Sequence, residues 1–96
     1  MQRQAQDLLL KQAKEKLRIT WEEENEKVQR LVHAAIVDIN KLGKVFNYEP
    51  ESPAKTLMLE HVFYNYNNAL HEFYRAYAPE LMALALDIAT GVHDAP

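Results

Sequence analysis

The sequence predicts an all-α fold, a small bundle of about four helices, and three observations support this. Glycine occurs only twice in 96 residues, so little interrupts regular structure. Apolar residues recur every three or four positions, the period of an amphipathic helix. Proline and glycine mark the ends of predicted helices at about 4–17, 21–42, 53–78 and 79–89. We expect residues 1–90 to form one domain and residues 91–96 to be a frayed tail.

The first two segments differ in the strength of their patterns. In 4–17, Leu10, Ala13 and Leu17, with Leu9 beside them, form a narrow apolar stripe. Thr20 and Glu23 match a capping box, so we expect a helix to start there and to end near Gly43. The apolar face of 21–42 comprises Trp21, Val28, Leu31, Val32, Ala35, Ile36, Ile39 and Leu42.

The third segment, 53–78, begins at Ser52-Pro53, which is typical of an N-cap followed by the first helical residue. Its broad face is predicted to form the subunit's own core and comprises Leu59, Val62, Phe63, Tyr66, Leu70, Phe73 and Tyr77. The opposite stripe mixes aromatic and polar groups, as protein interfaces do. We predict that this stripe binds a neighbouring subunit or partner through Leu57, His61, Tyr64, Asn68, His71 and Arg75.

Pro79 is expected to open a fourth helix, because it cannot continue the preceding one without the loss of a hydrogen bond. This helix is apolar nearly all round, and a 96-residue monomer can hardly enclose it. We therefore predict a subunit interface that includes Leu81, Leu84 and Ile88. Trp21 either belongs to this interface or covers the core.

Charge is distributed unevenly along the chain. Residues 1–44 hold nine Lys/Arg and seven Asp/Glu, whereas residues 45–96 hold two and seven. Since duplex binding depends on Lys/Arg contacts with phosphates, the composition predicts weak affinity for DNA. One acidic run has two interpretations, stabilisation of a helix start or the lining of a DNA channel. It consists of Glu22, Glu23, Glu24 and Glu26.

Several classes of function are disfavoured. The chain has no cysteine, which fits a reducing compartment and excludes thiolate zinc sites. His61 and His71 would lie about 15 Å apart along one helix, too far to share a metal ion. No catalytic or phosphate-binding motif occurs, so we expect no enzyme activity, metal or cofactor. The chain also lacks a secretory signal and an apolar run of about 20 residues, which predicts a soluble intracellular protein with no membrane partner.

Two stretches resemble a known family. The first is Leu-Arg-Ile-Thr-Trp-Glu-Glu-Glu at 17–24, followed by the apolar positions of the next helix. The second is 64–84, with Asn-Asn-Ala-Leu at 67–70, then Glu-Phe and Tyr. Together with the order of helices, the likeness covers most of residues 8–86. These features resemble the bacteriophage head-to-tail connector proteins, also called head-completion or adaptor proteins.

The resemblance implies a subunit of a homo-oligomeric ring, expected to be a dodecamer, that docks under the portal protein of a tailed phage. Such a ring extends the DNA channel and binds a tail-side connector or stopper protein, while genomic DNA passes through without sequence-specific binding. The implied location is the head-to-tail junction of the virion, after synthesis in the bacterial cytoplasm. Glu24-Asn25 stands where the family often has an acidic pair, so the second acid is missing here.

A second function is left open by the sequence, that of a small dimeric helical regulator, similar to an antitoxin, that sequesters a protein target. A regulator is expected to be a compact dimer, whereas a connector forms a large ring or assembles only on the portal. A DNA-reading helix-turn-helix is disfavoured, because about nine residues separate the two clearest predicted helices and that motif has three or four.

Overall fold

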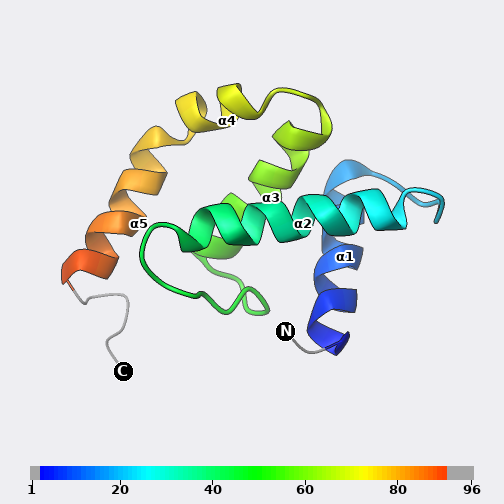
Figure 1. The fold of residues 1–96 in the computed structure, drawn as a ribbon, viewed down its shortest axis with the longest axis horizontal. Helices are drawn as coiled ribbons and strands as arrows, with labels where there is room; N and C mark the ends of the chain where they lie inside the picture. The colour runs from blue at the N-terminus through cyan, green and yellow to red at the C-terminus, as the bar shows by residue number, and fades with distance from the viewer. Residues whose placement is uncertain (1–2, 91–96) are drawn as a thin grey trace.

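The computed structural model describes residues 3–90, and every regular element in this part of the chain is a helix (Figure 1). The order is α1 (Arg3–Leu17), α2 (Asn25–Asn40), α3 (Pro53–Tyr66), α4 (Leu70–Ala76) and α5 (Ala78–Thr90). The all-α prediction is confirmed, with five helices in the described residues instead of about four. The predicted tail, 91–96, lies outside the described residues.

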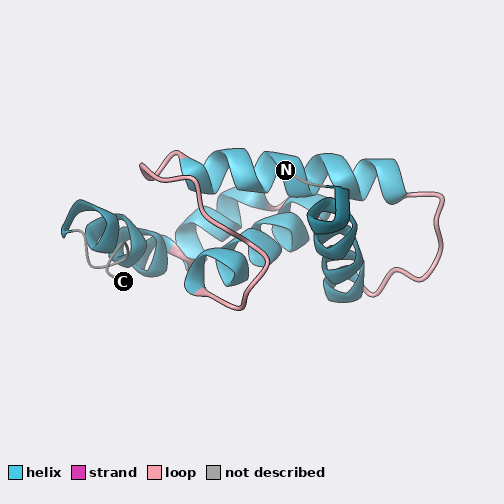
Figure 2. Ribbon diagram, turned by 90° about the horizontal axis from the view of Figure 1, so that it is seen from below, coloured by secondary structure: helices cyan, strands magenta, loops and turns pink. Residues whose placement is uncertain are grey.

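Helix α3 is the centre of the packing, since it contacts each of the other four helices. Helix α2 lies across it, and α1 packs against both. Helices α1 and α5 do not touch each other and lie toward opposite ends of the longest axis of the molecule (Figures 1 and 2).

The predicted apolar face is confirmed for the residues within α2, whereas Trp21 precedes the helix and is exposed. Val28, Val32, Ala35 and Ile39 are buried, at steps of four, three and four residues that keep them on one side of the helix. Burial of a Val or Ile side chain contributes roughly 1.5 to 3 kcal/mol, so this face is a main source of stability. Gly43 has a φ of 122° just beyond the helix, a conformation that favours glycine.

The start of α2 differs from the capping-box prediction at Thr20. The helix begins at Asn25, its N-cap is Glu24, and no side chain caps it. The Glu24 carboxylate is engaged instead by Trp21, whose Nε1 donates to it at 2.8 Å, and by the hydroxyl of Tyr66 at 2.9 Å. These bonds hold the segment before Asn25 in a turn, so the prediction that the helix starts at Thr20 was wrong.

The end of α1 is a Schellman motif. Arg18 has a φ of 60°, the left-handed conformation that closes such a motif. Its N–H donates to the carbonyl of Glu15 at 3.1 Å, and the N–H of Ile19 donates to the carbonyl of Lys14 at 2.9 Å. The turn at 17–19 thereby directs Ile19 into the core, where it is buried.

A second Schellman motif divides the helix predicted at 53–78. Asn68 has a φ of 57°, and asparagine tolerates this conformation better than most residues. The N–H of Asn68 donates to the Asn65 carbonyl at 3.1 Å, and the N–H of Ala69 donates to the Tyr64 carbonyl at 2.8 Å. The helix therefore ends at Tyr66 and restarts as α4, which explains the fifth helix.

The connection between α2 and α3 packs on the core. The Asn40 Oδ1 accepts from the Phe46 N–H at 3.3 Å and the Tyr48 hydroxyl at 2.9 Å, and both aromatic rings are buried. The Ser52 Oγ accepts from the Lys55 N–H at 3.1 Å, so the predicted N-cap is confirmed. The buried Nζ of Lys55 donates to the Glu49 carbonyl at 2.8 Å, which fixes the end of the loop against α3.

Candidate assembly surfaces

The two faces predicted for the third helix are partly exchanged in the structure. Leu57 and His61, predicted to bind a partner, are only 3% and 2% exposed and lie in the subunit's own core. Phe63, predicted to be in the core, is 38% exposed, and the Lys16 ammonium lies 5.6 Å from its ring centroid. The cause is the central position of α3, because helices packed on several sides bury more than one stripe.

The remaining residues of the predicted partner stripe are divided between core and surface. Tyr64 is partly buried and lies 6.1 Å from Phe73 and 6.2 Å from Tyr77 between ring centroids. Asn68, His71 and Arg75 are exposed. The break at 67–69 separates them from Leu57 and His61, so the stripe is not one continuous surface.

Helix α5 presents one face to the core and another to solvent. Leu84 is 3% exposed, and Leu81 and Ile88 are partly buried against the core. Leu84, which was predicted to contact a partner, therefore packs mainly within its own subunit. On the outward side lies an exposed apolar stripe, here called the α5 ridge, which comprises Met82, Ala83, Leu86 and Ala89.

A groove of about 420 Å³ runs between the start of α3 and α5. Its walls are mostly apolar and include Leu57 and Leu84. Glu80 and Asp87 are the charged side chains among its lining residues. The α5 side of the molecule is therefore both apolar and acidic.

A polar cluster that the sequence did not predict joins three helices. Asp38 of α2 accepts a hydrogen bond from the Tyr74 hydroxyl of α4, and the same Oδ2 lies 2.9 Å from the Nε2 of His61 in α3. His61 Nδ1 is buried and has no hydrogen-bond partner among the described residues. The phenol and the imidazole tie α3 and α4 to α2, which is a structural role.

A shallow cleft of about 470 Å³ opens beside this cluster and is here called the α2–α4 cleft. Its lining residues include no serine, threonine or cysteine that would serve as a nucleophile. The lining mixes apolar, aromatic and polar side chains, as protein interfaces do. The lining consists of His33, Ala34, Val37, Asp38, Lys41, His61, Asn65, Leu70 and Tyr74.

The cluster predicts a stability change at alkaline pH. Three effects raise the pKa of Tyr74 to about 12. The largest is burial, followed by the hydrogen bond to Asp38 and then by the negative charge of Asp38. An unfolded tyrosine has a pKa of about 10. The contribution of protonated Tyr74 to the free energy of unfolding is therefore complete below pH 10 and is lost between about pH 10 and 12. We expect Tyr74→Phe to be less stable than the parent at pH 7, with the difference shrinking across that window. Urea unfolding at pH 7, 10, 11 and 12 measures it; a constant difference would contradict the assignment.

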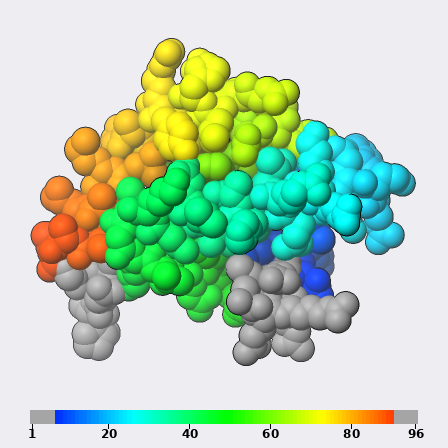
Figure 3. All heavy atoms as spheres, in the orientation of Figure 1, coloured from blue at the N-terminus to red at the C-terminus, as the bar shows by residue number. Residues whose placement is uncertain are grey.

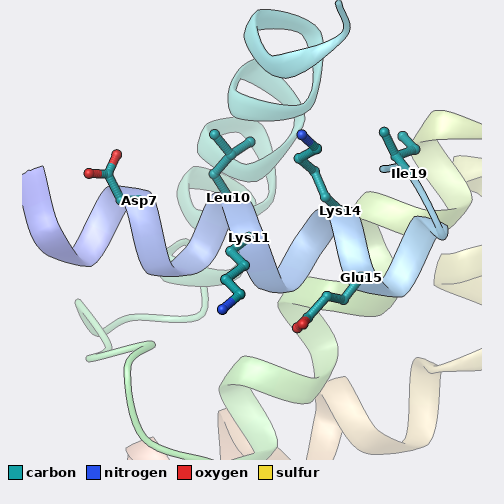
Figure 4. Close-up of a pocket in the computed structure, with 6 residues that line it drawn as sticks. All are labelled: Asp7, Leu10, Lys11, Lys14, Glu15 and Ile19. Carbon is teal, nitrogen blue, oxygen red and sulfur yellow. The ribbon is translucent and has the colours of Figure 1, made fainter. Parts of the chain in front are cut away.

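The surface of α1 has a smaller hollow of about 290 Å³. Figure 4 shows Leu10 and Lys14 on one side of the helix, with Lys11 and Glu15 on the other. The Lys14 ammonium donates to Asn25 Oδ1 at 2.7 Å, whereas Lys11 is exposed and has no ion-pair partner within the described residues. Because the lining has two acids and two bases, the hollow has no strong preference for a charged partner.

The four acids proposed for a DNA channel are not equivalent. Glu22, Glu23 and Glu26 are exposed. Glu24 is partly buried, and its hydrogen bonds from Trp21 and then Tyr66 lower the pKa of its carboxyl. Glu24 therefore serves the fold of the subunit, and the other three remain candidates for a channel. Trp21 is 45% exposed, so its predicted role at an interface stays a prediction.

Two further findings concern residues 3–90. No group of three or more His, Cys, Asp or Glu side chains is arranged to hold a metal ion there. No helix in this part of the chain has both the length and the apolar character needed to cross a membrane.

Comparison of the chain with protein-family models, with curated proteins and with solved structures finds no match.

Proposed function

We propose that this chain is a structural subunit of a phage head-to-tail connector ring. In this role it docks under the portal, extends the DNA channel and provides an attachment surface for tail components. The proposal joins the resemblance of residues 17–24 and 64–84 to one structural observation, the α5 ridge.

The α5 ridge supports assembly because it exposes large apolar side chains on a regular helix. Met82 is 68% exposed and Leu86 is 57% exposed, and they lie four residues apart on the same side of α5. Contiguous apolar surface of this kind marks contacts with other proteins. A subunit whose apolar surface is covered only by its neighbours in an assembly exposes that surface when it is alone.

The charge distribution supports passage of DNA. Residues 45–96 carry seven acids and two bases, and Glu22, Glu23 and Glu26 add exposed acids at the start of α2. An acidic wall repels phosphate and so avoids contacts that would hold DNA in the channel. A regulator that binds one protein does not require such an excess of acidic residues.

The decisive experiment mixes the purified protein with a portal protein from the same genome. We expect rings that extend the portal channel in electron microscopy, and fast-sedimenting complexes in ultracentrifugation. The protein without portal, and the portal without this protein, are the controls. If the protein forms only a compact dimer and leaves the portal unchanged, the connector proposal is wrong and the regulator is favoured.

A further inference from the structure

The structure holds an apolar ridge and a cleft on different helices, and we propose that they bind each other between copies of the chain. The α5 ridge of one subunit docks into the α2–α4 cleft of the next, in a head-to-tail contact. This inference rests on the proposed function, because it names the surfaces through which the ring would form.

Both surfaces expose apolar side chains. The ridge projects Met82 and Leu86 from the helix, and neither side chain is covered by its own subunit. The cleft has a volume of about 470 Å³ and includes the apolar side chains of Ala34, Val37 and Leu70. Val37 is itself 45% exposed, so the cleft offers apolar surface that the monomer leaves uncovered.

The borders of the two surfaces are also opposite in charge. Helix α5 carries Glu80 and Asp87, which line the groove next to Ala83 of the ridge, and it has no lysine or arginine. Neither acid has an ion-pair partner within the described residues. His33 and Lys41 line the cleft, and the exposed Arg30 lies at its rim, one helical turn before the lining residue Ala34. Opposite charges across an interface favour the correct partner and repel wrong arrangements.

One acid lies among the bases of the cleft, and it is already engaged. The Asp38 carboxylate accepts from the Tyr74 hydroxyl, lies 2.9 Å from His61 Nε2 and lies 3.9 Å from the Lys41 ammonium. Its charge is therefore partly balanced within the subunit. The cleft and its rim remain favourable for the acidic α5 of a neighbour.

Within one subunit the ridge and the cleft lie in different parts of the molecule, since α5 packs on α3 and α4 and no residue of α5 lines the cleft. In the space-filling view α2 crosses the face toward the viewer below α4, whereas α5 forms the left end of the molecule (Figure 3). The contact is thus heterologous, with different surfaces on the two partners. Contacts of this type close into rings or continue as filaments.

Charge exchange tests this contact. One double variant, Arg30→Glu with Lys41→Glu, reverses the cleft side, and another, Glu80→Lys with Asp87→Lys, reverses the ridge side. Each alone should weaken assembly about tenfold or more, because like charges then meet. An equimolar mixture should restore it, because every contact again pairs opposite charges. Sedimentation velocity and electron microscopy, with and without portal, measure assembly, and circular dichroism verifies the fold.

The control is Lys11→Glu with Arg18→Glu, which changes the net charge as much as the cleft variant but lies at α1 and its end. It should assemble like the parent. Arg30→Glu alone replaces the cleft variant if the loss of Lys41 beside Asp38 disturbs the fold.

The outcomes separate this inference from the proposed function. If the parent forms portal rings but the reversed variants assemble equally well, or the mixture shows no recovery, the inference is overturned and the connector proposal stands. If the parent forms only a closed dimer in every condition, both are overturned.

Discussion

Phe73→Ala is expected to destabilise the subunit by about 3 to 5 kcal/mol, because it removes a fully buried aromatic ring. Phe73 is 0% exposed, and its ring centroid lies 5.1 Å from that of His61, 5.4 Å from that of Tyr74 and 5.4 Å from that of Tyr77. A domain of this size has a total stability of about 5 to 15 kcal/mol, so the loss is a large share. Urea unfolding followed by circular dichroism measures it.

Phe63→Ala is the matched control, since it makes the same chemical change ten residues earlier. Phe63 is 38% exposed, so we expect a cost of about 1 kcal/mol or less. Equal losses for the two variants would show that Phe63 packs in the core, as the pattern of a straight helix predicted. A small loss for Phe73→Ala would contradict the burial of this ring in the core.

The elements that the sequence predicted well are those set by local chemistry. The face of α2 follows from its period, and the start of α3 follows from Ser52 and Pro53. A new helix does begin near Pro79, since α5 starts at Ala78. In each case the deciding groups lie within a few residues of one another, so a short window of sequence contains the information.

The break after α3 and the faces of α3 could not be predicted in the same way. The Asn67-Asn68 pair is a local signal for a left-handed helix end, but it lies inside a run of apolar and aromatic residues that favoured one long helix. Once the helix is divided, residues on either side of the break no longer share a face. The burial of Leu57 and His61 depends on which helices surround α3, and that is decided by tertiary packing.

The polar cluster could not be predicted for the same reason, because it depends on tertiary packing. Asp38, His61 and Tyr74 come from three helices. His61 lies 23 residues after Asp38 in the chain, and Tyr74 lies 36 residues after it. Asp38 does stand out as the one acid within 31–40, next to apolar positions on both sides. That signal marks a buried or paired carboxylate, but only the register between helices identifies its partners.

Leu84→Glu should detach α5 from the rest of the subunit and unfold it. Loss of the buried leucine alone costs about 2 to 5 kcal/mol, and an unpaired carboxylate buried in its place adds a further penalty. Glu80 and Asp87 line the same groove, so the new charge meets two acids and no base there. The expected result is a lower melting temperature and lost helicity in the monomer, which thermal circular dichroism detects. A parent-like melt would show that Leu84 does not pack against α3.

Leu86→Glu places the same side chain two residues further along α5 and separates folding from assembly. Leu86 is 57% exposed on the ridge, so the glutamate stays in water and the melting temperature should remain close to that of the parent. The variant should nevertheless fail to form rings with the portal, because a charge then replaces apolar surface at the proposed contact. Normal rings from Leu86→Glu would show that the ridge lies outside every interface. A strong loss of monomer stability would show instead that the outward side of α5 is packed within the subunit.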